Sequence, residues 1–401
     1  MITQRADLTF KHNRANGRHG WLRLTPAYSI KLVNELLDAH PAIQFVLEPF
    51  SGTGTTGLVC AERGVACDLL DINPFLVWLA RVKTTNYTLA DLQRAQTSAE
   101  QIAARAARAP AAELWFPPIS HIERWWSFDT REALAKIRRA LELELPAESA
   151  ARDLLLVAFC RLVIEWSNAT FNHQSISFRK NPAATARAEP RVAPARLSEI
   201  VRELCAAATE PLRGRVRVVN ADSRRIPLPR GELYDAVITS PPYPNRMSYI
   251  RELRPYMYWL GYLSQAQQAG ELDWQAIGGT WGAATSRLTQ WSPNGAEIRD
   301  PDFAAMLRAI EQASPLLANY VHRYFVDMVE HFASVSAALK PGGRVFYIVG
   351  NSKFYDTLVP VEKIFAQLLE RQGFVRSQID ILRKRNSKKE LIEFCVSAIK
   401  P

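Results

Sequence analysis

Ser240 and Tyr243 are the residues whose types and spacing most clearly suggest chemistry, and they enclose two prolines in the sequence Ser240-Pro241-Pro242-Tyr243. Ser240 offers a hydroxyl and a backbone carbonyl as hydrogen-bond acceptors, and Tyr243 offers an aromatic face. The prolines hold the chain extended and cannot donate to a sheet. A stiff pair of acceptors beside a stacking ring suits a flat ring that carries an amino group. Taken alone, however, the four residues are better explained as an ordinary proline-rich turn with a core tyrosine.

A second set of residues could form a ligand-binding turn near the start of the chain. Gly52 and Gly54 remove side chains where a backbone must approach a ligand closely. Asp71 follows seventeen residues after Gly54, which is close to the spacing of a carboxylate that binds ribose hydroxyls. With Gly57 the turn also fits Gly-x-Gly-x-x-Gly formally. A dinucleotide-binding turn and a tight structural turn are therefore both open at this point.

Together the two sets resemble the signatures of the DNA amino-methyltransferases, which methylate an exocyclic nitrogen of cytosine or adenine with S-adenosylmethionine. Residues 240–243 resemble that family's catalytic motif, (Asp/Asn/Ser)-Pro-Pro-(Tyr/Phe). Residues 48–56, Glu-Pro-Phe-Ser-Gly-Thr-Gly-Thr-Thr, resemble its cofactor motif, and S-adenosylmethionine has no pyrophosphate for a helix N-terminus to bind. The resemblance implies that the cofactor-binding residues are Glu48, Phe50, Gly52, Gly54, Asp71, Asp222 and Thr25, with Asp222 at the adenine amino group and the segment of Thr25 near the methionine end.

The resemblance further implies the catalytic residues Ser240, Pro241, Pro242 and Tyr243 and a direct methyl transfer that needs no metal ion. Serine at the first position is commoner among the N4-cytosine enzymes, whereas the adenine enzymes mostly carry aspartate. We therefore expect methylation of cytosine N4 in DNA, with adenine N6 as the alternative. Methylation of RNA or of a protein glutamine, and an inactive nucleic-acid-binding regulator, are further alternatives.

Apolar runs and turn residues predict the elements that must position these side chains. Short buried strands are expected at 43–47, 65–70, 215–220, 236–238 and 344–351, followed by an antiparallel pair at 379–382 and 391–399. Helices are expected at 55–63, 154–166 and 359–372, and another after Thr25 as N-cap and Pro26. The prediction is an α/β, Rossmann-like class I methyltransferase fold with a mostly parallel seven-stranded sheet and a helical insertion.

Composition divides the chain into five parts. Residues 1–90 form an N-terminal arm and the cofactor-binding half of the catalytic domain. Residues 91–213, rich in Ala, Arg and Leu, form a helical insertion between the second and third strands. Residues 214–263 hold the Ser-Pro-Pro-Tyr loop, residues 264–315 look irregular and are a possible target-recognition segment, and residues 316–401 complete the catalytic domain.

The charge pattern suggests a polyanionic partner, which we expect to be DNA. The formal net charge is +10. Basic and aromatic residues alternate after the catalytic loop, as they do on nucleic-acid surfaces. The candidate DNA-binding residues there are Arg246, Tyr249, Arg251 and Arg254, with His173, Arg179 and the basic loop 383–389 as further candidates.

The cysteines and the hydropathy predict a cytoplasmic protein with no membrane segment. Five cysteines are scattered singly without zinc-ligand spacing, which favours reduced and buried thiols. No apolar run is long enough to span a bilayer. Because no nuclease motif is evident, we expect a modification enzyme whose partner could be a separately encoded restriction enzyme.

Overall fold

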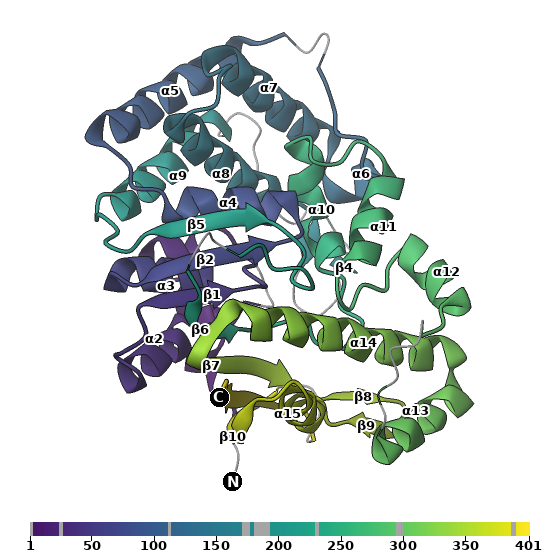
Figure 1. Cartoon of the computed structure of the whole chain (residues 1–401). Helices are drawn as coiled ribbons and strands as arrows, with labels where there is room; N and C mark the ends of the chain where they lie inside the picture. Colours follow the sequence, from purple (N-terminus) through teal and green to yellow (C-terminus); the bar gives the residue numbers. More distant parts are fainter. Residues whose placement is uncertain are drawn as a thin grey trace.

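A seven-stranded sheet forms the centre of the molecule (Figure 1). The computed structural model describes residues 3–23, 27–110, 114–170, 177–179, 193–228, 232–293, 298, 300–385 and 390–401, with the backbone alone at 193, 194 and 283. The strand order is β10-β11-β7-β6-β1-β2-β5. The strands are β1 (Phe45–Glu48), β2 (Ala66–Asp71), β5 (Val216–Asn220), β6 (Tyr234–Thr239), β7 (Leu339–Gly350), β10 (Val375–Lys384) and β11 (Ile392–Ile399). Within this sheet only β11 runs antiparallel to its neighbours, which confirms the predicted mostly parallel seven-stranded sheet.

The inner strand β1 brings the ends of its two neighbours together. It pairs in parallel with β2 on one side and with β6 on the other. Carboxyl ends of parallel strands meet at one edge of a sheet, and ligands of open α/β sheets bind there. Glu48, Asp71 and Thr239 end these three strands. The loops that follow them therefore meet at one edge.

Alternating side chains of β1 pack against helices on both faces of the sheet. Phe45 and Leu47 belong to one apolar core with α14 (Pro315–Ala338) and α15 (Val361–Arg371). Val46 belongs to a second core with α2 (Ile30–Ala39) and α3 (Thr55–Arg63). This alternation follows the two-residue period of a strand. Another helix, α4 (Pro74–Thr84), leads from β2 toward the insertion.

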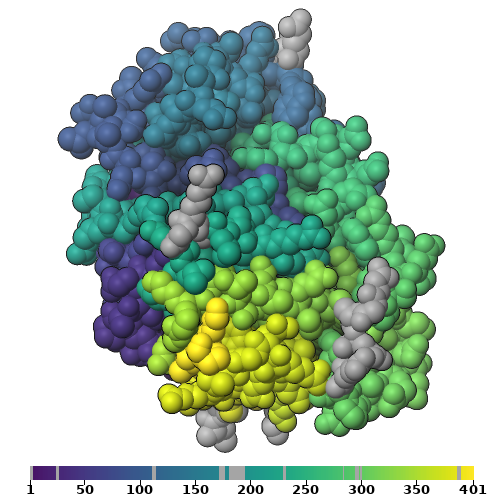
Figure 2. All heavy atoms as spheres, in the orientation of Figure 1, coloured from purple at the N-terminus to yellow at the C-terminus, as the bar shows by residue number. Residues whose placement is uncertain are grey.

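The insertion between β2 and β5 is helical, as predicted, and builds a core of its own. Its helices are α5 (Leu89–Arg108), α6 (Ile122–Trp125), α7 (Phe128–Glu144), α8 (Ala150–Glu165) and α9 (Ala193–Ala208), with a two-stranded sheet of β3 (Ala169–Thr170) and β4 (Ser177–Phe178). Helix α8 is buried along most of its length. The first part of the insertion forms the blue lobe at the top of Figure 2, and the C-terminal residues, in yellow, lie at the bottom.

The expectation of an irregular stretch over 264–315 is wrong, because most of it is helical. After α10 (Tyr249–Trp259) come α11 (Ala266–Gln275), α12 (Ala283–Gln290) and α13 (Pro301–Ala313). These helices are short and are separated by glycine and proline turns, which hide their periodicity in the sequence. The start of α13 is nonetheless capped: Asp300 accepts a hydrogen bond from the backbone of Phe303 at 2.9 Å, ahead of Pro301.

Two other boundaries differ in detail from the sequence prediction. Thr25 and Pro26 lie outside the described residues, and α2 begins only at Ile30, with Ser29 as N-cap. The segment Lys340–Gly343 is assigned to β7, yet it bulges: Leu339 pairs with Tyr234 and Arg344 with Ala236. β8 (Ser352–Phe354) and β9 (Thr357–Val359) form a short hairpin after β7.

All five cysteines are buried free thiols, as predicted. Within the described ranges, every helix is too short or too polar to cross a membrane.

Candidate active site

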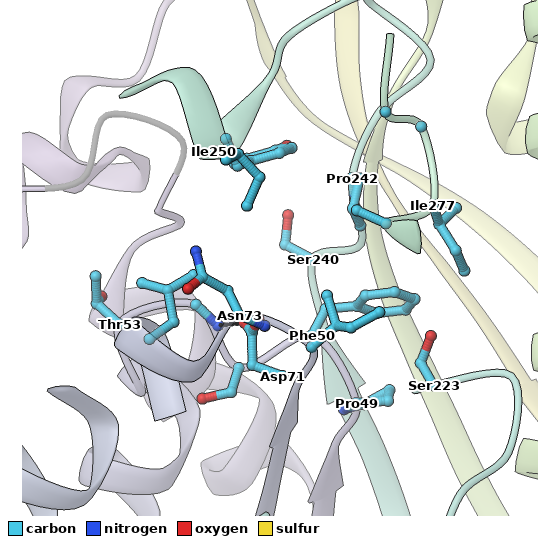
Figure 3. Close-up of a pocket in the computed structure, with 18 of the residues that line it drawn as sticks. Pro49, Phe50, Thr53, Asp71, Asn73, Ser223, Ser240, Pro242, Ile250 and Ile277 are labelled. Atoms are coloured by element: carbon cyan, nitrogen blue, oxygen red, sulfur yellow. Dashed lines mark hydrogen bonds between the residues drawn. The ribbon is translucent and has the colours of Figure 1, made fainter. Parts of the chain in front are cut away.

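A cavity opens at the edge of the sheet where β1, β2, β5 and β6 end. Residues from the loops after these strands line it, together with residues of α10 and of the turn after α11. Figure 3 shows Phe50, Asp71, Asn73, Ser240 and Ile250 around this common space. The loop predicted to bind the cofactor and the Ser-Pro-Pro-Tyr loop therefore share one cavity.

The glycine turn after β1 is tied to the end of β2. Gly52 has a φ of +51°, a left-handed conformation that favours glycine. Its backbone N–H donates to Asp71 Oδ2 at 2.9 Å, and the N–H of Ser51 donates to the carbonyl of Leu70 at 2.8 Å. These bonds fix the turn, so that Gly52 lines the cavity as predicted.

Gly54 has a different role from the one the spacing suggested. It does not line the cavity; a Cβ on it would lie 3.1 Å from Cβ of Ala80 and 3.6 Å from Leu69. Its φ of +77° places it at the start of α3. Gly54 therefore allows close packing of the turn on α4.

Asp71 points into the cavity while its carboxylate also accepts two backbone hydrogen bonds. One comes from Gly52 and the other from Asn73, where the N–H to Oδ1 distance is 2.9 Å. Burial raises the pKa of Asp71 to about 6, against these hydrogen bonds, which lower it. Each oxygen keeps a lone pair for a ligand hydroxyl.

The cavity is acidic and apolar. Its described lining includes three aspartates, Asp71, Asp222 and Asp273, but no lysine, arginine or histidine. Phe50 supplies an apolar wall and is backed by the ring of His331, with ring centroids 4.9 Å apart. Such a lining favours a ligand with an aromatic part and positive charge and disfavours a pyrophosphate.

The Ser-Pro-Pro-Tyr loop reaches the cavity through Ser240 and Pro242. The hydroxyl of Tyr324 donates to the carbonyl of Pro242 at 2.8 Å and holds the loop in place. Tyr243 does not line the cavity. Its hydroxyl donates to Glu393 Oε1 at 3.2 Å and lies 3.4 Å from Ser240 Oγ.

Comparison with known proteins gives consistent relatives along nearly the whole chain. No protein-family model matches it. Type II methyltransferase M.AvaI of Nostoc sp. is 24% identical over 429 aligned positions, covering 96% of this chain and 85% of the relative. Type II methyltransferase M.BsoBI of Geobacillus stearothermophilus is 22% identical and covers 96% and 84%, and M.MvaI of Kocuria varians is 22% identical and covers 87% and 79%.

The chain is a methyltransferase, similar over most of its length to these type II methyltransferases. Its fold is the predicted Rossmann-like methyltransferase fold, and its methyl donor is S-adenosylmethionine. The solved structure of the rRNA methyltransferase aviRa from Streptomyces viridochromogenes aligns over 93% of this chain and 86% of that chain, with a TM-score of 0.29 and 12% identity. That likeness is too low to bear on the substrate.

Glu48 of the methyltransferase faces the interior and not the cavity. It is fully buried, and its carboxylate accepts hydrogen bonds from Tyr28 at 2.8 Å, from Thr56 at 2.7 Å and from Thr239. The backbone N–H of Phe50 also donates to it at 3.0 Å. Glu48 thus joins β1, α3 and β6 beneath the cofactor turn.

Asp222 lines the cavity, but its carboxylate is bound by Arg224. The guanidinium donates to Oδ2 at 2.7 Å and also reaches Asp327 at 2.8 Å. Burial would raise the pKa of Asp222, but the Arg224 hydrogen bonds outweigh it and lower that pKa. The methyltransferase therefore presents Asp222 as an ionised, already paired acceptor.

The candidate DNA-binding residues occupy different environments. Tyr249 lines the cavity, Arg246 is exposed with a φ of +62°, and Arg251 is half-buried. Arg254 lies over Trp281, with its guanidinium carbon 4.6 Å from the ring centroid.

The other basic candidates are only partly described. Arg383 pairs with Glu393 at 2.6 and 3.0 Å. Arg179 is exposed, whereas His173 and residues 386–389 lie outside the described part of the chain.

Sequence reasoning missed Asp273, which lines the cavity from α11. It accepts hydrogen bonds from Ser248 Oγ and from the backbone of Trp281 at 2.7 Å. Ile250 and Ile277 were missed as cavity walls in the same way. The glycine run at 278–282 was the available signal, because such turns bring backbone close to ligands.

Proposed function

We propose that this methyltransferase modifies DNA by adding a methyl group to the exocyclic N4 of cytosine. The observation that carries the proposal is that the cofactor turn and the Ser-Pro-Pro-Tyr loop line one cavity. Relatives that cover at least 87% of the chain are type II methyltransferases, and the net charge of +10 suits a polyanionic substrate.

The residues of the cavity fit S-adenosylmethionine. The carboxylate of Asp71 can accept from ribose hydroxyls, Phe50 can pack against the adenine, and the acidic lining favours the sulfonium and ammonium charges. Asp222 can accept from the adenine amino group with a lone pair that Arg224 leaves free. When bound, S-adenosylmethionine supplies an electrophilic methyl group.

The chain would orient the target amine and hold it against solvent. A base must leave the stack to reach the cavity, at a cost of a few kcal/mol. Ser240 Oγ and the carbonyl of Pro241 accept hydrogen bonds from its amino group, which leaves the nitrogen lone pair facing the cavity. Tyr243 stacks on the base, worth roughly 1–3 kcal/mol. The nitrogen gains the methyl group and loses a proton to water, so positioning carries the reaction.

Serine at position 240 favours cytosine, because aspartate is commoner at this position in adenine enzymes of the resembled family. A neutral hydroxyl accepts a weaker hydrogen bond than a carboxylate. The serine hydroxyl is a sufficient acceptor if the amine loses its proton only after the methyl group has been transferred. Adenine N6 is the second candidate, since the backbone carbonyl serves either amine. We also propose a role in restriction and modification, with a separately encoded nuclease as the partner.

Labelled methyl transfer tests the proposal directly. The protein is incubated with tritiated S-adenosylmethionine and, in separate reactions, with unmethylated phage DNA, RNA or a protein extract. Nucleosides from the DNA are then identified by mass spectrometry. We expect N4-methylcytosine; N6-methyladenine would overturn the base assignment alone, and label only in RNA or protein would overturn the DNA assignment.

Ser240→Ala provides the matched test of the site. Loss of this acceptor should lower the rate of transfer about tenfold or more while S-adenosylmethionine binding is retained. Ser120→Ala, an exposed serine of the insertion, is the control and should behave as wild type.

A further inference from the structure

Arg385 covers the ring on which a target base would stack. Its guanidinium carbon lies 5.3 Å from the ring centroid of Tyr243. A planar guanidinium and a nucleobase are both flat groups that bind the π-face of an aromatic ring. The two cannot occupy the same face of Tyr243 at once.

The contact is built from several fixed points. Arg385 Nη1 donates to the carbonyl of Asn351 at 2.9 Å, and its backbone N–H donates to the carbonyl of Leu391 at 2.8 Å. Gly350 makes room for both partners: a Cβ there would lie 2.7 Å from Arg385 Nη1 and 2.9 Å from Cε2 of Tyr243. The guanidinium is therefore seated over the ring and is not merely near it.

The hydroxyl of Tyr243 is held separately from its ring face. It donates to Glu393, which is buried and bound by Arg383 at 2.6 and 3.0 Å. Removing Arg385 from the ring would leave this anchor in place. A variant can thus remove the guanidinium of Arg385 from the ring of Tyr243 without removing the hydrogen bond that holds the Tyr243 hydroxyl.

We propose that Arg385 is a positioning residue that occupies the base-stacking face of Tyr243 before DNA binds and yields it to the extruded base. The proposal rests on the proposed DNA-methylating function. Base stacking on an aromatic ring is similar in strength to a partly buried cation–π contact, so the base can compete with the guanidinium for the ring. The displaced cation starts the basic segment 385–389 and would remain near the phosphates.

Arg385→Lys is the sharpest test, because it keeps the charge and removes the planar group. Initial rates are measured with tritiated S-adenosylmethionine over a range of unmethylated phage DNA concentrations. We expect KM for DNA to fall by about two- to fivefold with kcat unchanged, since the base no longer displaces a guanidinium. A KM that is unchanged or raised, or a lower kcat, would overturn the proposal.

A second pair of variants separates the ring contact from the loss of charge. Arg385→Ala and Lys384→Ala each remove one cation from the same strand end, but Lys384 makes no described ring contact. We expect KM for DNA to be lower in Arg385→Ala than in Lys384→Ala; equal values would contradict the inference. If the wild-type protein transfers no label to DNA, the proposed function fails. If the wild-type protein is active but Arg385→Ala and Lys384→Ala have the same KM for DNA, only the role of Arg385 is refuted.

Discussion

At the scale of single residues, Asp71 ties the glycine turn after β1 to the cavity in which we propose that S-adenosylmethionine binds. Its carboxylate holds the N–H groups of Gly52 and Asn73 and also lines the cavity. Asp71→Ala should weaken S-adenosylmethionine binding by about 10- to 100-fold, because charge-assisted hydrogen bonds contribute about 1.5–3 kcal/mol. Calorimetry measures the change, with the exposed Asp356→Ala as control; an unchanged affinity in the folded variant would refute the role.

The raised pKa of Asp71 should make the affinity for S-adenosylmethionine depend on pH. Burial raises that pKa to about 6. Below this pH the carboxyl is protonated and loses acceptors for ribose hydroxyls, so affinity should rise with pH through about 6 and level off above it. Calorimetric titrations across this range check the sign, and an affinity that falls as pH rises would contradict it.

Tyr243 allows the ring and the hydroxyl to be tested separately. Tyr243→Phe keeps the stacking ring and loses the hydrogen bond to Glu393, so we expect it to retain most of the turnover. Tyr243→Ala removes the ring and should lower turnover roughly 10-fold or more, since stacking contributes about 1–3 kcal/mol. Steady-state methylation of phage DNA measures both, with the exposed Tyr355→Ala as control; equal loss in both Tyr243 variants would assign the role to the hydroxyl.

At the scale of elements, Glu48 is the buried junction of β1, α3 and β6. Burial raises its pKa to about 7 against the hydrogen bonds of Thr239, Thr56 and Tyr28. The folded protein therefore holds this proton more tightly than the unfolded chain, whose glutamate pKa is about 4.3. Glu48 therefore contributes its full share of the folding stability below about pH 4.3, and this contribution is lost as the pH rises through about 7.

Glu48→Gln should flatten this pH dependence. The wild-type free energy of unfolding should fall by about 3 kcal/mol from this group between about pH 4 and pH 8, and the variant should lack that component. Urea unfolding at several pH values measures it, with the exposed Glu35→Gln as control. The same slope in Glu48→Gln and wild type would refute the assignment.

The parts of the fold that were predictable are those with strong local signals. The buried strands and the glycine turn follow from apolar runs and from Gly52, and the closing hairpin of β10 and β11 from its flanking turn. The helices α11 to α13 were not predictable, because their short amphipathic stretches are broken by glycine and proline. The direction of side chains could not be predicted from the motifs either. Glu48 belongs to the motif that resembles a cofactor-binding sequence, yet its side chain faces the interior, because the alternation of side chains along β1 decides which way it points.

The site was predictable only where one motif supplies its residues. Ser240, Gly52 and Asp71 line the cavity as expected. Asp273 could not be found, because α11 reaches the cavity through tertiary packing. The pairing of Asp222 with Arg224 and the cover of Arg385 on Tyr243 likewise depend on side-chain contacts that spacing does not show.

At the scale of the whole molecule, the net charge of +10 should dominate DNA affinity. Neutralised phosphates release counterions, so the association constant should fall steeply with salt. With 6–10 phosphate contacts the loss would be about 10³–10⁵ between 50 and 200 mM salt. Fluorescence anisotropy with labelled duplex DNA measures the slope, and a flat response would show that the charge serves another purpose.

The position of β1 between β2 and β6 also has a kinetic consequence. Its neighbour β6 arrives late, because Glu48 and Thr239 are 191 positions apart. At about 5–20 residues per second of synthesis, β1 waits roughly 10 to 40 s with one edge unpaired. During that interval the local contacts of the insertion helices can form. Completion of the central sheet is therefore the late step of biogenesis, and an unprotected β1 edge on the nascent chain is the point where misassembly would begin.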